Sequence, residues 1–460
     1  MSENNCNKLY EEANELYREK KFTEAVKLYK EAAELGSVEA TYMLGICYNY
    51  NLGVDEPDES VRGKIASKYF IKAGDNGHAD AQCFAALCYL HGIGVEKDVE
   101  TAIKRFEDSA KGGCTQAMNN LGYIYENNLN YTEDEELEEE EVAENYQLAF
   151  DWYMKSAEKN DPTGQLSVGK CYYYGRGVER NIAEAIKYYT LSAQQGLADA
   201  LFRLGECYDD GEGVESDEIE AFELYKQAAL KNHPKAQCYV GYAYEYGNGV
   251  PKDMNEALRW YNLSAQNKYF QAYCNLGCCY EEGRGVKRNM QKAIEMYEEG
   301  AKLGSVMAMY NLGNVYAFGK GVKVNNELAV EFYERAAQNG MPEAQFNLAQ
   351  HLYEGKGVEQ DYEASAYWFL EAAKNGDSDA QCKIGSFYMN GIGVEEDPEL
   401  GFKWFMRSAK QGDYDAQYSV GVCYEEGIGV EADINSAYDW YSRAAAQGHS
   451  GAKKAMKRLK

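Results

Sequence analysis

Two kinds of amphipathic segment alternate along most of the chain. The first kind repeats small residues and a tyrosine on one side, and a clear copy consists of Ala236, Gln237, Gly241 and Tyr244. The second kind repeats small residues around an aromatic pair, and a clear copy consists of Ala257, Trp260, Tyr261, Ser264 and Ala265. Spacings of three and four residues place side chains on one face of an α-helix. The pattern therefore predicts an all-α protein in which first and second helices alternate.

A turn of sequence Gly-x-Gly-Val connects most first helices to the second helix that follows; the opening pair and the copy near Tyr125 lack it. Eight copies recur at a period of 36 residues, and their glycines are Gly175 and Gly177, Gly211 and Gly213, Gly247 and Gly249, Gly283 and Gly285, Gly319 and Gly321, Gly355 and Gly357, Gly391 and Gly393, and Gly427 and Gly429. A further copy lies upstream, from Gly92 to Val95. A period of this size is typical of solenoids built from helical pairs, so we assign these glycines a structural role.

The start of each second helix is marked by a short polar residue six positions after the first glycine of the turn. These residues are Asp98, Asn181, Asp217, Asp253, Asn289, Asn325, Asp361, Asp397 and Asp433. A side-chain oxygen at such a position accepts from the free backbone N–H groups of the first helical turn. A different glycine, such as Gly241, lies inside most first helices, although Ala86 and Ala349 replace it in two, and it costs about 1 kcal/mol relative to alanine. Its recurrence predicts close contact with a bulky aromatic side chain.

These residues resemble the Sel-1-like repeat family, a relative of the tetratricopeptide repeat. The resemblance rests on the run Ala-x-x-x-x-Gly-x-x-Tyr-x-x-Gly-x-Gly-Val and a following Ala-x-x-Trp-Tyr helix, and it covers nearly the whole chain. It implies an all-α, right-handed α/α superhelical solenoid whose inner surface is lined mainly by the first helices. It also implies adaptor roles in signalling, in ubiquitin-linked quality control at the endoplasmic reticulum and in wall synthesis.

The repeats divide the chain into three parts. Residues 1–36 lack the glycine turn and look like a plain tetratricopeptide pair, residues 37–448 hold eleven Sel-1-like repeats, and residues 449–460 form a capping helix. The lysines of that last helix suit a helix C-terminus, although a basic targeting or membrane-docking tail is the alternative. Two insertions break the period: five residues around Asp55–Glu59, and an acidic loop at about 129–146. We expect the acidic loop to be solvated, or else to dock on a basic partner or gate one end of the groove.

Composition limits the partners and the compartment. The formal net charge of −28 repels phosphate backbones, so we expect no nucleic acid. No stretch approaches the length and apolarity of a membrane span, and residues 1–5 lack the features of a secretory signal, so we expect a cytoplasmic protein without membrane insertion. Ten of the thirteen cysteines occupy two positions of the first helix and none lies on a second helix, which favours buried thiols over disulfides.

No group of residues indicates catalysis or metal binding. The five histidines lie at loops or helix ends without ligand spacing, and HExxH, CxxC and Walker motifs are absent. Some cysteine-rich bacterial members of the family it resembles are described as binding or slowly cleaving β-lactams, so a β-lactamase-like hydrolase is a remote alternative. Ser156 to Lys159 and Ser450 to Lys453 match Ser-x-x-Lys, but the companion Ser-Asp-Asn and Lys-Thr-Gly elements are missing. We therefore predict no enzyme and no cofactor.

The predicted function is a protein–protein interaction scaffold that binds partners through the concave groove of the solenoid. The candidate binding residues stand near the ends of first helices and are Asp209, Asp210, Glu281, Glu282, Glu425, Glu426, Tyr174 and Tyr246. Acids at a helix C-terminus interact unfavourably with the helix dipole, at a cost in stability of about 0.3–1 kcal/mol. Because stability does not favour them, we interpret them as an acidic stripe that recruits a Lys/Arg-rich partner segment. The alternatives are acids kept for solubility, tyrosines that belong to the core, and a role as a subunit of a ubiquitin-ligase or membrane quality-control complex.

Overall fold

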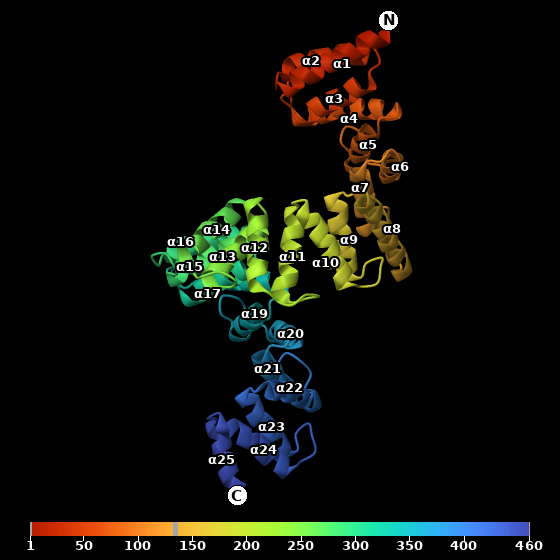
Figure 1. Cartoon of the computed structure of the whole chain (residues 1–460). Coiled ribbons are helices and arrows are strands. Elements are labelled where there is room, and N and C mark those ends of the chain that lie inside the picture. The colour runs from red at the N-terminus through yellow and green to blue at the C-terminus, as the bar shows by residue number, and fades with distance from the viewer. Residues whose placement is uncertain (1, 132–136, 460) are drawn as a thin grey trace. The chain divides into compact units, whose positions relative to one another are not determined.

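The computed structural model describes residues 2–131 and 137–459, and every helix or strand assigned within them is an α-helix. Contacts divide the chain into two compact units, Met1–His233 (unit 1) and Pro234–Lys460 (unit 2). In Figure 1, unit 1 runs from red to yellow-green and unit 2 from green to blue. Within each unit every helix packs against the next one in the chain. The all-α prediction of tandem helical pairs is confirmed.

Each unit contains six helical pairs. The first helices of unit 1 are α1 (Ser2–Arg18), α3 (Val38–Asn49), α5 (Ala79–His91), α7 (Thr115–Glu126), α9 (Pro162–Tyr174) and α11 (Ala198–Asp210), and its second helices are α2 (Phe22–Glu34), α4 (Glu59–Asp75), α6 (Val99–Lys111), α8 (Glu139–Glu158), α10 (Ile182–Gln194) and α12 (Glu218–Leu230). The first helices of unit 2 are α13 (Pro234–Tyr246), α15 (Phe270–Glu282), α17 (Val306–Phe318), α19 (Pro342–Glu354), α21 (Ser378–Asn390) and α23 (Tyr414–Glu426). Its second helices are α14 (Met254–Gln266), α16 (Met290–Lys302), α18 (Asn326–Gln338), α20 (Tyr362–Lys374), α22 (Pro398–Gln411) and α24 (Ile434–Ala446), and α25 (Ser450–Arg458) packs on the last of them.

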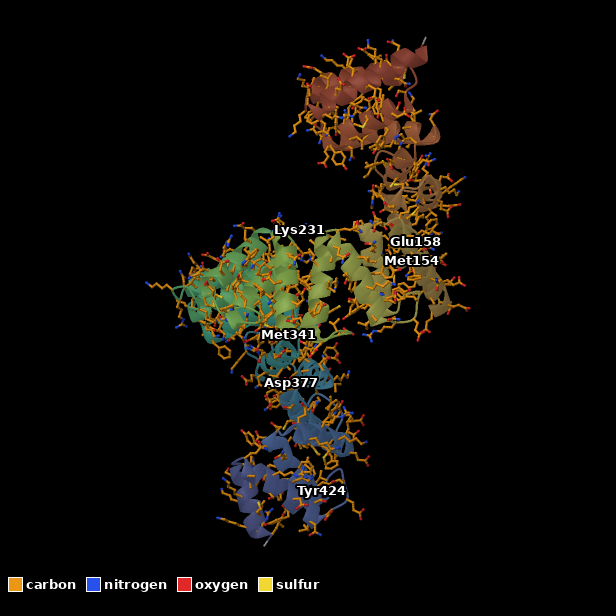
Figure 2. All side chains as sticks on the ribbon, viewed as in Figure 1. Met154, Glu158, Lys231, Met341, Asp377 and Tyr424 are labelled. Atoms are coloured by element: carbon orange, nitrogen blue, oxygen red, sulfur yellow. The ribbon has the colours of Figure 1, made fainter. Side chains whose placement is uncertain are left out.

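Short polar residues cap the N-termini of the second helices, as predicted. All nine Asn and Asp residues that follow the turns are N-caps of second helices, and each accepts from backbone N–H groups of the first helical turn. Several first helices are capped in the same way: Asp377, labelled in Figure 2, accepts from the Ala380 N–H at 2.6 Å. His78 and His449 also serve as caps, each accepting a backbone N–H through Nδ1. Two of the five histidines thus have a structural role at helix starts.

The turn glycines are required by backbone conformation and by close contact. All sixteen have φ between +63° and +85°, in the left-handed region that glycine adopts without steric cost. A Cβ atom on the second glycine of several turns would also collide with the start of the preceding second helix. On Gly393, for example, it would strike the backbone of Tyr362. Any side chain at this point would therefore push consecutive repeats apart.

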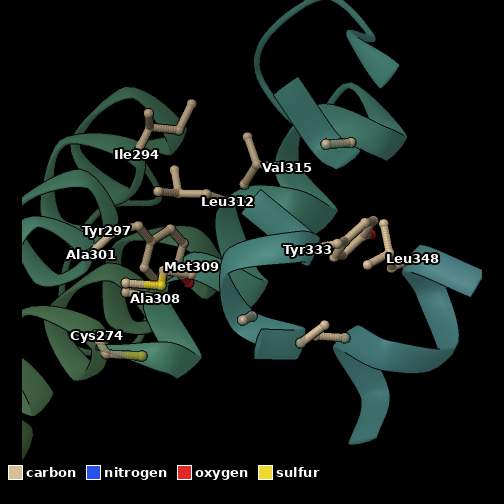
Figure 3. Close-up of a cluster of buried hydrophobic side chains, with 14 of the residues drawn as sticks. Cys274, Ile294, Tyr297, Ala301, Ala308, Met309, Leu312, Val315, Tyr333 and Leu348 are labelled. Carbon is tan, nitrogen blue, oxygen red and sulfur yellow. The ribbon is translucent and has the colours of Figure 1, made fainter. Parts of the chain in front are cut away.

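Where a first helix contains the internal glycine, an aromatic ring from the second helix of the same repeat packs against it. A Cβ atom on Gly241 would lie 2.7 Å from Cδ1 of Tyr261, and Gly277 meets the ring of Tyr297 in the same way. Figure 3 shows Tyr297 in the buried cluster that also contains Leu312 and Tyr333. The predicted contact between a helix glycine and a bulky aromatic side chain is confirmed.

Most of the extra residues of the two insertions belong to helices and not to loops. The predicted loop at about 129–146 is wrong from residue 139 onward, because α8 begins at Glu139 and is 20 residues long. Acids stabilise a helix start through the dipole, and the carboxylate of Glu141 accepts from the Glu138 N–H at 3.0 Å. Likewise α4 begins at Glu59 and has 17 residues, where most second helices have 13. Residues 132–136 of the predicted acidic loop lie outside the described residues.

Candidate functional site

The first acid of each predicted pair is engaged inside its own repeat. In five repeats the carboxylate accepts a hydrogen bond from a tyrosine of the second helix: Tyr153 to Glu126 at 2.8 Å, Tyr225 to Asp209 at 3.2 Å, Tyr261 to Glu245 at 2.7 Å, Tyr297 to Glu281 at 2.8 Å and Tyr441 to Glu425 at 2.7 Å. The tyrosine rings are buried, so the acid satisfies a hydroxyl group that water does not reach. Burial raises the pKa of Asp209 above its usual value. The expectation that stability does not favour acids at these helix ends is therefore wrong for Asp209, Glu281 and Glu425.

The choice of acid follows the choice of aromatic residue. In four repeats the tyrosine stands sixteen residues after the acid. Where Leu90, Tyr353 and Met389 replace the acid, the residue sixteen positions later is phenylalanine: Phe106, Phe369 and Phe405. Where Ala317 replaces it, the hydroxyl of Tyr333 donates instead to Oδ1 of Asn314 at 2.7 Å. In these repeats a carboxylate occurs where a buried hydroxyl needs an acceptor, whereas the repeat with Tyr173 at the acid position keeps a buried tyrosine, Tyr189, sixteen residues later.

Four of these five carboxylates also bind a cation from beyond their own repeat. Glu126 pairs with Arg176 at 3.1 Å, Glu281 pairs with Lys320 at 2.7 Å, and Glu245 pairs with Arg284. Each of these cations is the middle residue of the following Gly-x-Gly turn. Glu425 pairs at 2.7 Å with Arg458 of α25, the predicted capping helix. Sequence analysis missed Glu126 and Glu245, although both stand at the same repeat position as the acids it selected.

The second acid of each pair is exposed. Asp210, Glu282 and Glu426 lie at the C-terminal ends of α11, α15 and α23, and Glu282 pairs with Nε of Arg284 at 2.9 Å. The structure therefore places the three acidic pairs on separate helices, one in unit 1 and two in unit 2.

The two candidate tyrosines are exposed rather than buried in the core. Tyr174 is 48% exposed and lies under the guanidinium of Arg176, 5.1 Å from its ring centre. Tyr246 is 45% exposed, its ring packs on Tyr242, and its hydroxyl accepts from Arg284 at 3.2 Å. Both rings remain available for contact with another molecule.

Exposed aromatic rings are concentrated on the first helices. We number the positions of each first helix from the residue just before it, which counts as zero. The second, sixth, ninth and thirteenth positions on this count define the exposed first-helix face. Among the described residues ten tyrosines and phenylalanines are exposed, and eight of them lie on first helices or their C-terminal caps: Tyr50, Tyr123, Tyr174, Tyr242, Tyr246, Phe270, Phe318 and Tyr414. The other two, Tyr362 and Tyr367, lie on α20. Clustered exposed aromatic residues are typical of surfaces that bind proteins.

Two residues outside this face bear on enzymatic alternatives. The side chain of Ser156, from the first Ser-x-x-Lys match, is completely buried, so a substrate does not reach it. Cys114 is half-buried, and its interaction with Cys83 lowers the pKa of its thiol to about 6. In the described part of the chain no three His, Cys, Asp or Glu residues are grouped to hold a metal ion. Nor does any helix there combine the length and apolarity needed to cross a membrane.

Comparison with known proteins identifies the repeat. A family model described as Sel1 repeat matches twelve segments: residues 9–37, 38–78, 79–113, 115–161, 162–197, 198–233, 234–269, 270–305, 306–341, 342–377, 378–413 and 415–449. The first of these is the opening pair, which the model includes although it lacks the glycine turn. A similar solved structure is c5321, a protective antigen of uropathogenic Escherichia coli with an SLR fold; it is 28% identical, the match covers 94% of this chain and 90% of that one, and the TM-score is 0.60. A Sel1 repeat protein from Oxalobacter formigenes is 31% identical over 67% of this chain and 90% of its own, with a TM-score of 0.51. No curated protein matches the chain.

Proposed function

The chain belongs to the Sel1 repeat family, and from this premise we propose that it is a scaffold that binds other proteins through the exposed first-helix face. The observation that carries the proposal is that six of the ten exposed tyrosines and phenylalanines of the described residues lie on this face: Tyr50, Tyr123, Tyr174, Tyr242, Tyr246 and Phe318. Transfer of the apolar surface of an exposed ring from water into contact with a partner is favourable. Nothing in the repeat requires rings at these positions, since other repeats carry Asn314 or Gln350 there.

The proposal includes the kind of partner and the compartment. The exposed acids Asp210, Glu282 and Glu426 favour partner segments that carry lysine or arginine. The thirteen cysteines are free thiols, which suits a reducing compartment such as the cytoplasm. In this proposal residues 37–448 form the interaction array, and residues 1–36 and 449–460 flank it.

A capture experiment with matched surface variants tests the proposal. The full chain is used as bait beside two quadruple serine variants, one of first-helix residues (Tyr50, Tyr123, Tyr242 and Phe318) and one of second-helix residues (Ile219, Tyr362, Tyr367 and Ile434). Partners are fixed by cross-linking and identified by mass spectrometry. The first-helix variant should lose partners that the second-helix variant keeps. Equal retention by both variants, with unchanged circular dichroism, would contradict the proposal.

A further inference from the structure

Apolar residues recur on the exposed first-helix face of three consecutive first helices of unit 1, although α7 contributes Tyr123 alone, beside Gln116, Asn120 and Asn127. On α3, α5 and α7 the face carries Met43, Ile46, Tyr50, Phe84, Leu87 and Tyr123, which we call the apolar patch. None of these six side chains is buried, and Tyr50 and Tyr123 are 59% and 52% exposed. At the same positions α19 carries Glu343, Asn347, Gln350 and Glu354. Because α19 has the same fold with polar side chains, the repeat itself does not require the patch.

The patch is continuous across its helices. The rings of Tyr42 on α3 and Phe84 on α5 lie 6.1 Å apart, and Ile46 packs against the same buried cluster as Phe84. Leu87 packs on the cluster shared by α5, α6 and α7. On α7 the amide nitrogen of Asn120 lies 4.0 Å from Sγ of Cys83 on α5. The patch residues of α3 and α5 therefore share one buried cluster, and α7 lies beside α5.

Only negative charges accompany this surface on its own helices. No lysine or arginine occurs in α3, α5 or α7, and their charged residues other than the terminal His91 are Glu39, Asp80 and Glu126. Both insertions that break the 36-residue period follow helices of the patch. The one after α3 exposes Asp55, Asp58 and Glu59, and the one after α7 leads into the exposed start of α8, Glu138–Glu140. The C-terminal ends of α3 and α7 add the negative end of the helix dipole at the same edge.

We infer that the apolar patch docks a basic amphipathic helix of a partner protein, with its apolar side on the patch and its lysines or arginines against the acidic edge. Three adjacent first helices span roughly 20 Å, which a helix of about 14 residues matches. An apolar stripe at helical spacing fills a hydrophobic groove of this kind, and the surrounding charges select its sign. The inference rests on the proposed function and names one partner class and its place.

The test uses a labelled peptide and matched variants of the full chain. The probe is a fluorescein-labelled peptide of about 14 leucines and lysines, with leucines on one helical side, titrated by fluorescence anisotropy. Replacing Tyr50 and Tyr123 with serine should raise the dissociation constant about tenfold or more, because two exposed anchor rings are removed. Replacing Tyr242 and Phe318, which stand at the same repeat positions in unit 2, should leave it within about twofold. Neutralising Asp55, Glu139 and Glu140 to amides should weaken binding and reduce its dependence on salt.

Several results would overturn the inference. A peptide of the same composition with scrambled order that binds equally well would show general attraction to a chain of net charge −28. A leucine–glutamate peptide that binds as tightly would remove the role of charge. Loss of binding in the Tyr242 and Phe318 variant instead would move the site to unit 2 and leave the scaffold proposal intact. Absence of binding by the native chain would refute the docking site alone, since the capture experiment tests the scaffold independently.

Discussion

The contact between Glu245 and Tyr261 gives the sharpest test of how the repeats are held together. The Glu245 side chain is only 5% exposed, accepts from the Tyr261 hydroxyl at 2.7 Å and pairs with Arg284 of the next repeat. Replacing Glu245 with alanine leaves a buried hydroxyl without this acceptor, which costs about 1–3 kcal/mol. Arg284 is 30% exposed and keeps Glu282 and the hydroxyl of Tyr246, so its lost ion pair adds at most about 1 kcal/mol. The expected loss of local stability is about 2–3 kcal/mol.

Hydrogen exchange read by mass spectrometry measures this loss where it occurs. Repeat arrays often unfold in parts, so the exchange of α13 and α14 is compared with that of α5 and α6 in unit 1. A loss of about 2–3 kcal/mol corresponds to roughly 30-fold to 150-fold faster exchange in α13 and α14. The change should leave α5 and α6 unaffected.

A double-mutant cycle decides whether the effect belongs to the hydrogen bond. Tyr261→Phe alone should cost about 1–2 kcal/mol, because it leaves the carboxylate paired only with Arg284. In the Glu245→Ala background the same change should cost almost nothing, since the hydroxyl no longer has its partner. If Tyr261→Phe costs the same in both backgrounds, the carboxylate does not stabilise the repeat through this hydroxyl.

Three further predictions concern single positions. Gly241→Leu should overpack the ring of Tyr261, cost at least about 1–3 kcal/mol and lower the melting midpoint, whereas an unchanged midpoint would contradict the packing account. Asp217→Ala should destabilise the start of α12 by about 1 kcal/mol, seen as faster exchange of its first-turn amides, while Asp217→Asn should retain most of the cap. The folded-state pKa of the Cys114 thiol is lowered to about 6, so its alkylation by iodoacetamide should rise with pH to half its maximum near pH 6. Buried Cys83, whose pKa is raised, should stay unreactive there, and a Cys114 midpoint near pH 9 would refute the shift.

Much of the fold was predictable because its determinants lie close together in sequence. The N-caps and the helix glycine act on a neighbouring turn or on a helix of the same repeat, and the second glycines of several turns contact the repeat just before, so their spacing shows their role. The start of α8 was missed because its acids were interpreted by their charge alone. At Glu139 the same acids stabilise the first turn of a helix.

The candidate site was harder to predict because one acid position serves two purposes. Sequence analysis interpreted Asp209, Glu281 and Glu425 through the helix dipole, which disfavours them. In four repeats the acid is followed sixteen residues later by tyrosine, and in three repeats without the acid the later residue is phenylalanine; this pattern was present in the sequence and indicates the acceptor role. The apolar patch was missed for a different reason: Tyr50, Phe84 and Tyr123 look like core residues until their repeat positions are aligned.

The arrangement of constant and variable positions explains how one repeat can carry different surfaces. Packing fixes three features of the repeat: the aromatic ring that lies against the helix glycine, the acceptor of that ring's hydroxyl, and the turn glycines. A change at any of them strains the contact between helices. The most exposed positions of the first-helix face, such as Tyr50 and Tyr123, have no such constraint, whereas Phe84 and Leu87 also pack on buried clusters. Substitutions at the most exposed positions should therefore alter binding with little effect on stability, and substitutions at the glycine and acceptor positions should do the reverse. That separation makes the variants at Tyr50 and Tyr123 informative about recognition rather than folding.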